Sequence, residues 1–253
     1  MRQLLILYEI GFVLGIDNDK LVEVMSEQIG FKTFQGHRPR VKFCGMTRTE
    51  DVRFAVKLGV DAIGLIMVPN TARGLSPQAA KRLRDLVPSS IACVCVVQNP
   101  SVAIVNQIQD EVAPDFIQFH GQETNEFCEQ FSQPYWKALA VKDQASLART
   151  QDYALAHTLL LDGWTADGAG GHGVGFDWSL LTGIAKQSQQ QFALAGGLAP
   201  CNIALTRSLI QQGCIDLLDV SSGTEHVCTA QQKGIKSHAR MQAFMAEVQA
   251  LRQ

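Results

Sequence analysis

Short apolar runs recur along this chain from residue 41 onward, with amphipathic stretches between them. The runs span residues 41–44, 62–67, 92–97, 116–119, 135–140, 158–162, 192–195 and 215–220. Most are apolar on both faces rather than alternating, as is typical of parallel strands that are buried on both sides. Eight evenly spaced strand-and-helix units favour an α/β fold of the closed (β/α)8 TIM-barrel type over the alternative, an open doubly wound sheet.

The composition fits one large domain preceded by a segment of different character. Hydrophobic residues make up 46% and charged residues 18% of the 253 residues, which is enough apolar material for a sizeable core. No linker interrupts residues 40–250, so we predict a single catalytic barrel domain over 39–253. Residues 1–38 are interpreted as an N-terminal extension, either an added helical arm or the product of a start codon assigned too far upstream. Glu9 and later charges in this extension disfavour a secretory signal or a membrane span.

The net charge limits the binding partners that can be expected, and the cysteine pattern limits the metal and redox sites. The formal net charge is −2 at pH 7, so neither nucleic acid nor an anionic membrane is expected as a partner. Any attraction for an anionic substrate must then be local. The 7 cysteines form no CxxC pair, which disfavours zinc and thioredoxin-like redox sites. Reduced thiols in a cytoplasmic protein are the expected state.

Several helix starts can be predicted from polar residues that follow the runs. Thr47 and Glu50 have the spacing of a capping box ahead of the first helix. Ser76 and Asn99 each precede a proline, which predicts a polar cap followed by proline at the first helical position.

A thiol and a carboxyl stand at the ends of two of the runs. Cys44 ends the first run and Asp162 ends the sixth. In a barrel such positions face the mouth where active sites lie, so the two side chains predict a base and an acid. Lys42 lies two residues before Cys44, on the same side of the strand, and would favour the thiolate. Asp219 also lies at a strand end and competes for the role of the acid.

Two turns rich in glycine and serine follow the last two runs. The loops after the seventh and eighth strands of such barrels commonly bind phosphate, because glycine lets backbone N–H groups approach and serine adds hydroxyl donors. The residues that we predict to bind phosphate here are Gly196, Gly197, Ser221, Ser222 and Gly223.

Other polar residues follow further strands and are predicted to line the same mouth. His120 would either donate a hydrogen bond to a substrate or be a hydrogen-bonded structural histidine. Arg73 precedes a helix start and is suited to a bidentate pair with a carboxylate. The glycines between residues 168 and 175 form a further candidate loop.

Taken together, these residues resemble phosphoribosylanthranilate isomerase of tryptophan biosynthesis over roughly residues 40–248. The motifs that carry the resemblance are Lys-Phe-Cys-Gly-Met-Thr at 42–47, Gln-Phe-His-Gly at 118–121, Leu-Leu-Leu-Asp at 159–162, Phe-Asp-Trp at 176–178, Ala-Gly-Gly-Leu at 195–198 and Asp-Val-Ser-Ser-Gly-Thr-Glu at 219–225. Six motifs in the same order make the resemblance specific.

The resemblance implies the third step from chorismate to tryptophan, an Amadori rearrangement that needs no metal and no organic cofactor. Asp162 would protonate the ribose ring oxygen and open the ring. Cys44 would then remove the proton from sugar C2. Arg73 would hold the anthranilate carboxylate, and the two glycine-serine turns would hold the 5′-phosphate. A monomer or a homodimer is expected.

Two alternatives stay open at this point. Another phosphosugar barrel enzyme, such as the aminoaldose isomerase of histidine biosynthesis, would use two carboxylates in place of the thiol and carboxyl. A barrel that only binds a phosphorylated metabolite would not need both strand-end groups.

Overall fold

The computed structural model describes residues 39–163, 176–182, 184, 190–226 and 233–251. The predictions made for the extension 1–38 and for the glycines between 168 and 175 concern residues that lie outside these ranges.

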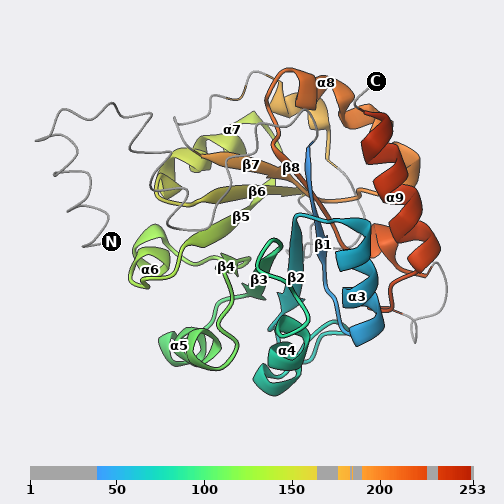
Figure 1. Cartoon of the computed structure of the whole chain (residues 1–253). Coiled ribbons are helices and arrows are strands. Elements are labelled where there is room, and N and C mark those ends of the chain that lie inside the picture. The colour runs from blue at the N-terminus through green and yellow to red at the C-terminus, as the bar shows by residue number, and fades with distance from the viewer. Residues whose placement is uncertain (1–38, 164–175, 183, 185–189, 227–232, 252–253) are drawn as a thin grey trace, which may run out of the picture. The chain divides into compact units, whose positions relative to one another are not determined.

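In the described part of the chain, eight parallel strands close into a barrel in chain order (Figure 1). The strands are β1 (Arg40–Cys44), β2 (Ala62–Ile66), β3 (Ala92–Val97), β4 (Phe116–Phe119), β5 (Tyr135–Val141), β6 (Thr158–Gly163), β7 (Gln191–Leu194) and β8 (Leu217–Val220). Each predicted run overlaps its strand, and the ends differ by at most two residues. The pairing of β1 with β8 closes the sheet, so the predicted barrel is confirmed and the open sheet is wrong.

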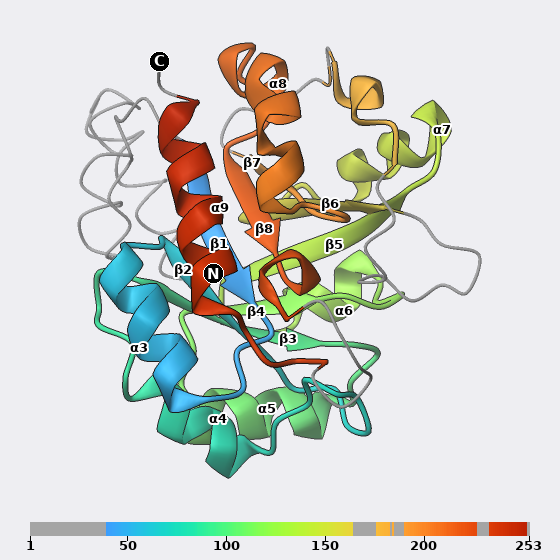
Figure 2. The same cartoon turned by 90° about the vertical axis from the view of Figure 1, so that its right-hand side faces the viewer.

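Helices cover the outside of the barrel, and Figure 2 shows the last of them lying beside β1 and β8. The helical segments are α3 (Thr49–Leu58), α4 (Pro77–Arg84), α5 (Val102–Glu111), α6 (Asn125–Glu129), α7 (Gln144–Leu147), η1 (Ala148–Tyr153), η2 (Trp178–Leu181), η3 (Pro200–Thr206), α8 (Arg207–Gln211), η4 (Ser222–Thr224) and α9 (His238–Ala250). No described helix is long and apolar enough to cross a membrane.

The strands divide their side chains between two environments. Phe43 points outward and meets Phe244 of α9 edge to face, with 5.8 Å between the ring centroids. Lys42, one residue earlier, points into the barrel, where it is fully buried and contacts polar groups of β4 and β8. The outer layer is therefore an apolar core, whereas the barrel interior below the mouth contains charged and amide groups.

Local capping was predicted with mixed success. Ser76 caps α4 as expected, because its hydroxyl accepts a hydrogen bond from the backbone N–H of Ala79. The capping box at Thr47 is wrong, since α3 begins at Thr49 and Arg48 precedes it without a side-chain cap. The cap at Asn99 is also wrong. Ser101 caps α5 instead, and Asn99 adopts a left-handed conformation with φ 46.

Candidate active site

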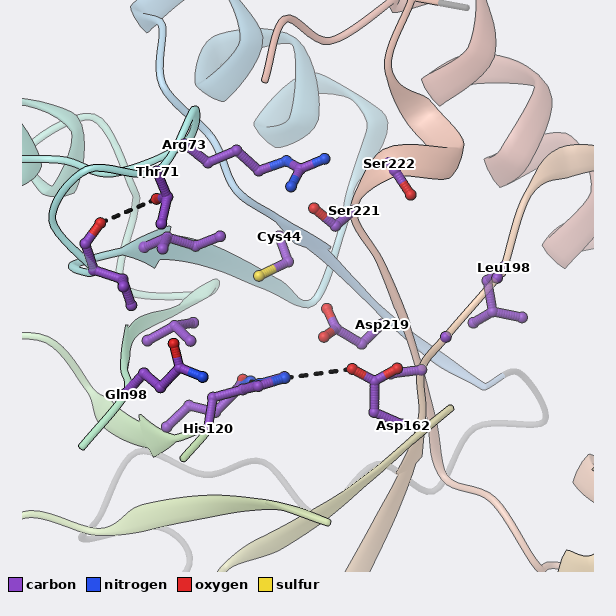
Figure 3. Close-up of a pocket in the computed structure, with 17 residues that line it drawn as sticks. Cys44, Thr71, Arg73, Gln98, His120, Asp162, Leu198, Asp219, Ser221 and Ser222 are labelled. Carbon is purple, nitrogen blue, oxygen red and sulfur yellow. Dashed lines mark hydrogen bonds and ion pairs between the residues drawn. The ribbon is translucent and has the colours of Figure 1, made fainter. Parts of the chain in front are cut away.

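A pocket opens at the carboxyl ends of the strands, where active sites of such barrels lie (Figure 3). Its lining consists of Cys44, Ile66, Val68, Thr71, Arg73, Val96, Gln98, Gln118, His120, Asp162, Ala195, Gly196, Gly197, Leu198, Asp219, Ser221 and Ser222. All the site residues predicted individually from the sequence are in this lining except Gly223. The structure thus brings together residues from strands that are far apart in the chain.

Cys44 lies at the end of β1, and its thiol is buried at the pocket wall. A Cβ atom added to Gly64, on the neighbouring strand β2, would lie 2.7 Å from Cys44 Sγ and 3.0 Å from Lys42 Cε. The glycine therefore makes room for both side chains. Burial raises the pKa of the Cys44 thiol above its ordinary value of 9.0, while the positive charges of Lys42 and Lys236 act in the opposite direction.

Asp162 lies at the end of β6 and faces the same pocket (Figure 3). Its Oδ1 accepts a hydrogen bond of 2.8 Å from the backbone N–H of Gly163, and its Oδ2 lies 3.3 Å from His120 Nε2. Gly196 has φ +78, and a Cβ atom there would lie 2.7 Å from Asp162 Oδ1. The close approach of the two loops therefore requires glycine at position 196.

The competing carboxyl, Asp219, belongs to a buried ion pair. Lys42 Nζ donates to Asp219 Oδ1 and Oδ2 at 3.1 and 3.2 Å, and to Gln118 Oε1 at 2.9 Å. Burial alone would lower the pKa of Lys42, but the charges of Asp219 and Cys44 and the hydrogen bonds to them together outweigh this effect and raise it. Burial raises the pKa of Asp219, while the charge of Lys42 and its hydrogen bonds act in the opposite direction. One ammonium engages both carboxylate oxygens, which leaves Asp219 less free than Asp162 to approach a substrate. We therefore favour Asp162 over Asp219 as the acid.

Arg73 is held by a carboxylate of the chain itself. Its Nε and Nη2 donate to Glu225 Oε1 and Oε2 at 2.6 and 2.9 Å. Glu225 also accepts from Lys236 Nζ at 3.3 Å and from the backbone N–H of Gly234 at 3.1 Å. The bidentate geometry that the sequence predicts for Arg73 is thus present, with Glu225 as its partner.

The residues predicted to bind phosphate take two different positions. Gly197 has φ 74. At the pocket wall, Ser221 immediately precedes η4 and Ser222 is its first residue. Ser221 Oγ is buried and has no hydrogen-bond partner among the described residues. Gly223 lies against the backbone instead, since a Cβ atom there would be only 1.8 Å from the carbonyl oxygen of Leu198.

Three polar residues of the site were given no role from the sequence. Gln118 and Glu225 stand inside quoted motifs, but nothing in their local sequence indicates which residue each one contacts. Lys236 precedes α9, 11 residues after Glu225, and is almost fully buried while donating to the carbonyl oxygen of Ser221 at 2.8 Å. A buried lysine in a polar segment leaves no signal in hydropathy, so only the fold reveals it.

Comparison with known proteins gives a consistent result along the barrel. Residues 41–247 match the family described as N-(5′-phosphoribosyl)anthranilate isomerase. A protein of that name from Nitrosomonas europaea is 41% identical over 214 residues, which are 84% of this chain and 96% of the relative. Another from Legionella pneumophila is 37% identical over 212 residues, covering 83% of this chain and 97% of the relative.

Solved structures agree with these matches. The crystal structure of phosphoribosylanthranilate isomerase from Thermotoga maritima has a TM-score of 0.72 and 30% identity, covering 84% of this chain and 99% of that one. A phosphoribosylanthranilate isomerase in complex with reduced 1-(o-carboxyphenylamino)-1-deoxyribulose 5-phosphate has a TM-score of 0.70 and 27% identity, with the same coverage.

Proposed function

The chain belongs to the N-(5′-phosphoribosyl)anthranilate isomerase family, and on this premise we propose how its pocket carries out the reaction. The protein is an isomerase of tryptophan biosynthesis. It converts N-(5-phosphoribosyl)anthranilate to 1-(2-carboxyphenylamino)-1-deoxyribulose 5-phosphate by an Amadori rearrangement. The roles of individual residues given below are our proposal.

Asp162 acts as the general acid in the first step. It transfers a proton to the ribose ring oxygen as the bond between C1 and that oxygen breaks, which leaves a protonated imine between C1 and the anthranilate nitrogen. The supporting observation is that both Asp162 and Asp219 line the pocket, but Asp219 is paired with the ammonium of Lys42. A mechanism with two free carboxylates is therefore disfavoured.

Cys44 acts as the general base in the second step. Its thiolate takes the proton from C2 of the opened sugar, and the resulting enolamine tautomerises to the ketone. The ammonium groups of Lys42 and Lys236 favour the thiolate against the effect of burial. The single observation that carries the proposal is that this thiol and the Asp162 carboxyl reach one pocket from β1 and β6.

The two ends of the substrate are anionic, and the pocket offers groups for each. For the 5′-phosphate, Ser221 contributes a buried hydroxyl that is unpaired among the described residues, and the backbone at Gly196 and Gly197 is accessible. For the anthranilate carboxylate, Arg73 contributes Nη1, since Glu225 occupies its Nε and Nη2. Glu225 thereby fixes the direction of the guanidinium before the substrate arrives.

The test is turnover of freshly prepared phosphoribosylanthranilate, followed by the loss of its fluorescence. Cys44→Ala and Asp162→Asn should each lower kcat by about 100-fold or more, because each removes one proton-transfer group. Both variants should still bind a reduced analogue of the product. Cys201→Ala is a matched control, since Cys201 is exposed and lies outside the pocket lining. A rate near that of the wild type for either variant would overturn the assignment of that residue.

Two further properties belong to the proposal. We propose a cytoplasmic enzyme, in keeping with its metabolic pathway and its thiol base. We also propose a monomer or a homodimer, which light scattering of the purified chain would distinguish. A solved relative from Thermotoga maritima is described as dimeric, with monomers obtained from it.

A further inference from the structure

A continuous chain of polar side chains, most of them in the pocket lining, crosses the barrel and ends at Asp162. It begins at Asp219, which accepts from Lys42 Nζ, and continues through Gln118, whose Oε1 accepts from the same ammonium at 2.9 Å. Gln118 Nε2 lies 3.0 Å from His120 Nδ1. His120 Nε2 in turn lies 3.3 Å from Asp162 Oδ2, the pair joined by a dashed line in Figure 3.

The ammonium of Lys42 determines which way the Gln118 amide points. A lysine ammonium has three donors and no acceptor, so the amide must present its oxygen to it. The opposite orientation would place the NH2 group against the ammonium, with two donors facing each other inside the barrel. Lys42 and Gln118 are both essentially fully buried, so water is not there to relieve such a conflict.

The orientation of the amide in turn determines the tautomer of His120. The amide nitrogen of Gln118 can only donate, so His120 Nδ1 must accept. An imidazole that accepts at Nδ1 carries its hydrogen on Nε2, and this is the nitrogen that faces Asp162.

We propose that Gln118 is a positioning residue that holds His120 in the Nε2–H tautomer, with this N–H directed at the carboxyl of Asp162. The inference rests on the proposed role of Asp162 as the acid. When Asp162 gives its proton to the ring oxygen, its carboxyl becomes a carboxylate, and the N–H of His120 stabilises the charge that develops there. His120 keeps its own proton throughout this step. Lys42 thereby serves both sides of the site, since it also favours the thiolate of Cys44.

The tautomer is measured by 15N NMR of the protein labelled at histidine, with the His120 signals assigned by their loss in His120→Asn. In the wild type, Nδ1 should be unprotonated and Nε2 protonated. In Gln118→Glu the new carboxylate accepts from both Lys42 and the ring, so Nδ1 should become protonated. Gln122→Glu makes the same chemical change at an exposed position four residues away and should leave the His120 signals unchanged.

Kinetics supply the second measurement. Gln118→Met has a similar length but no polar group, so it should lower kcat about tenfold or more with little change in KM, as expected for loss of a hydrogen bond to a developing charge. Binding of the reduced product analogue reports whether this variant is folded. A protonated Nδ1 in the wild type, or an undiminished kcat in a folded Gln118→Met, would overturn the inference. Loss of activity in Cys44→Ala and Asp162→Asn does not depend on either result, so failure of the inference can be told apart from failure of the proposed function.

Discussion

Replacing Glu225 by glutamine tests how much the buried cluster of Arg73, Glu225 and Lys236 contributes to stability. Burial alone would raise the pKa of Glu225, but the hydrogen bond from Arg73 and the charges of Lys236 and Arg73 outweigh it. They lower the pKa from 4.5 to about 2. Such a difference between the unfolded and folded chain corresponds to about 3 kcal/mol of stability at neutral pH.

The pH dependence of this contribution has a definite direction. Because the pKa of Glu225 is lower in the folded chain, its contribution is complete above about pH 4.5 and is lost as the pH falls toward about 2. About 2 kcal/mol of it remains at about pH 3.5. Glu225→Gln should therefore destabilise the protein by about 3 kcal/mol at pH 7 but by only about 2 kcal/mol at about pH 3.5.

Urea unfolding followed by tryptophan fluorescence, for both proteins at both pH values, measures the two differences. Glu50→Gln is the matched control, since the side chain of Glu50 is 54% exposed in its pair with Arg48. Exposed pairs of this kind contribute less than about 1 kcal/mol. The reasoning is refuted if the destabilisation by Glu225→Gln does not change with pH, or if it is no larger than that of the control.

Two further predictions concern the anionic ends of the substrate. Ser221→Ala should raise KM about tenfold, because it removes a donor to the phosphate. The fold should be unchanged, since the hydroxyl has no hydrogen-bond partner to lose among the described residues. Steady-state kinetics with a phosphate-bearing substrate checks this, and an unchanged KM would remove Ser221 from the phosphate site. Arg73→Ala should lower kcat/KM by about 10- to 100-fold. An analogue without the anthranilate carboxylate should be used equally poorly by wild type and variant, whereas equal losses for both substrates would place Arg73 elsewhere.

The strands could be predicted from the sequence because burial on both faces leaves a local pattern. Caps were harder, because tertiary contacts compete for the same polar residues. At Asn99 the side-chain oxygen accepts from the backbone N–H of Gln122, in the loop after β4, and the backbone N–H of Asn99 donates to Glu123. Asn99 therefore connects two loops by hydrogen bonds, and Ser101 is the residue that caps α5.

The residues of the candidate site could likewise be predicted only in part from the sequence. Cys44 and Asp162 could be predicted because each is a reactive group at the end of an apolar run. Their supporting contacts could not, because they join distant parts of the chain. Lys42 contacts Gln118 and Asp219, which are 76 and 177 residues away in sequence. Which residues meet across a closed barrel depends on strand register, and no local pattern specifies that register here.

Gly64 sets a limit on how this enzyme could be redesigned or could diverge. The space that its missing side chain leaves is already filled by the sulfur of Cys44 and the stem of Lys42. A two-carboxylate isomerase would need a carboxylate in place of the thiol, and this bulkier group would have to fit into the same space. Even an alanine at position 64 would remove it. The base at position 44 on β1 therefore depends on the residue at position 64 on β2, and substitutions at these two positions should be screened as a pair.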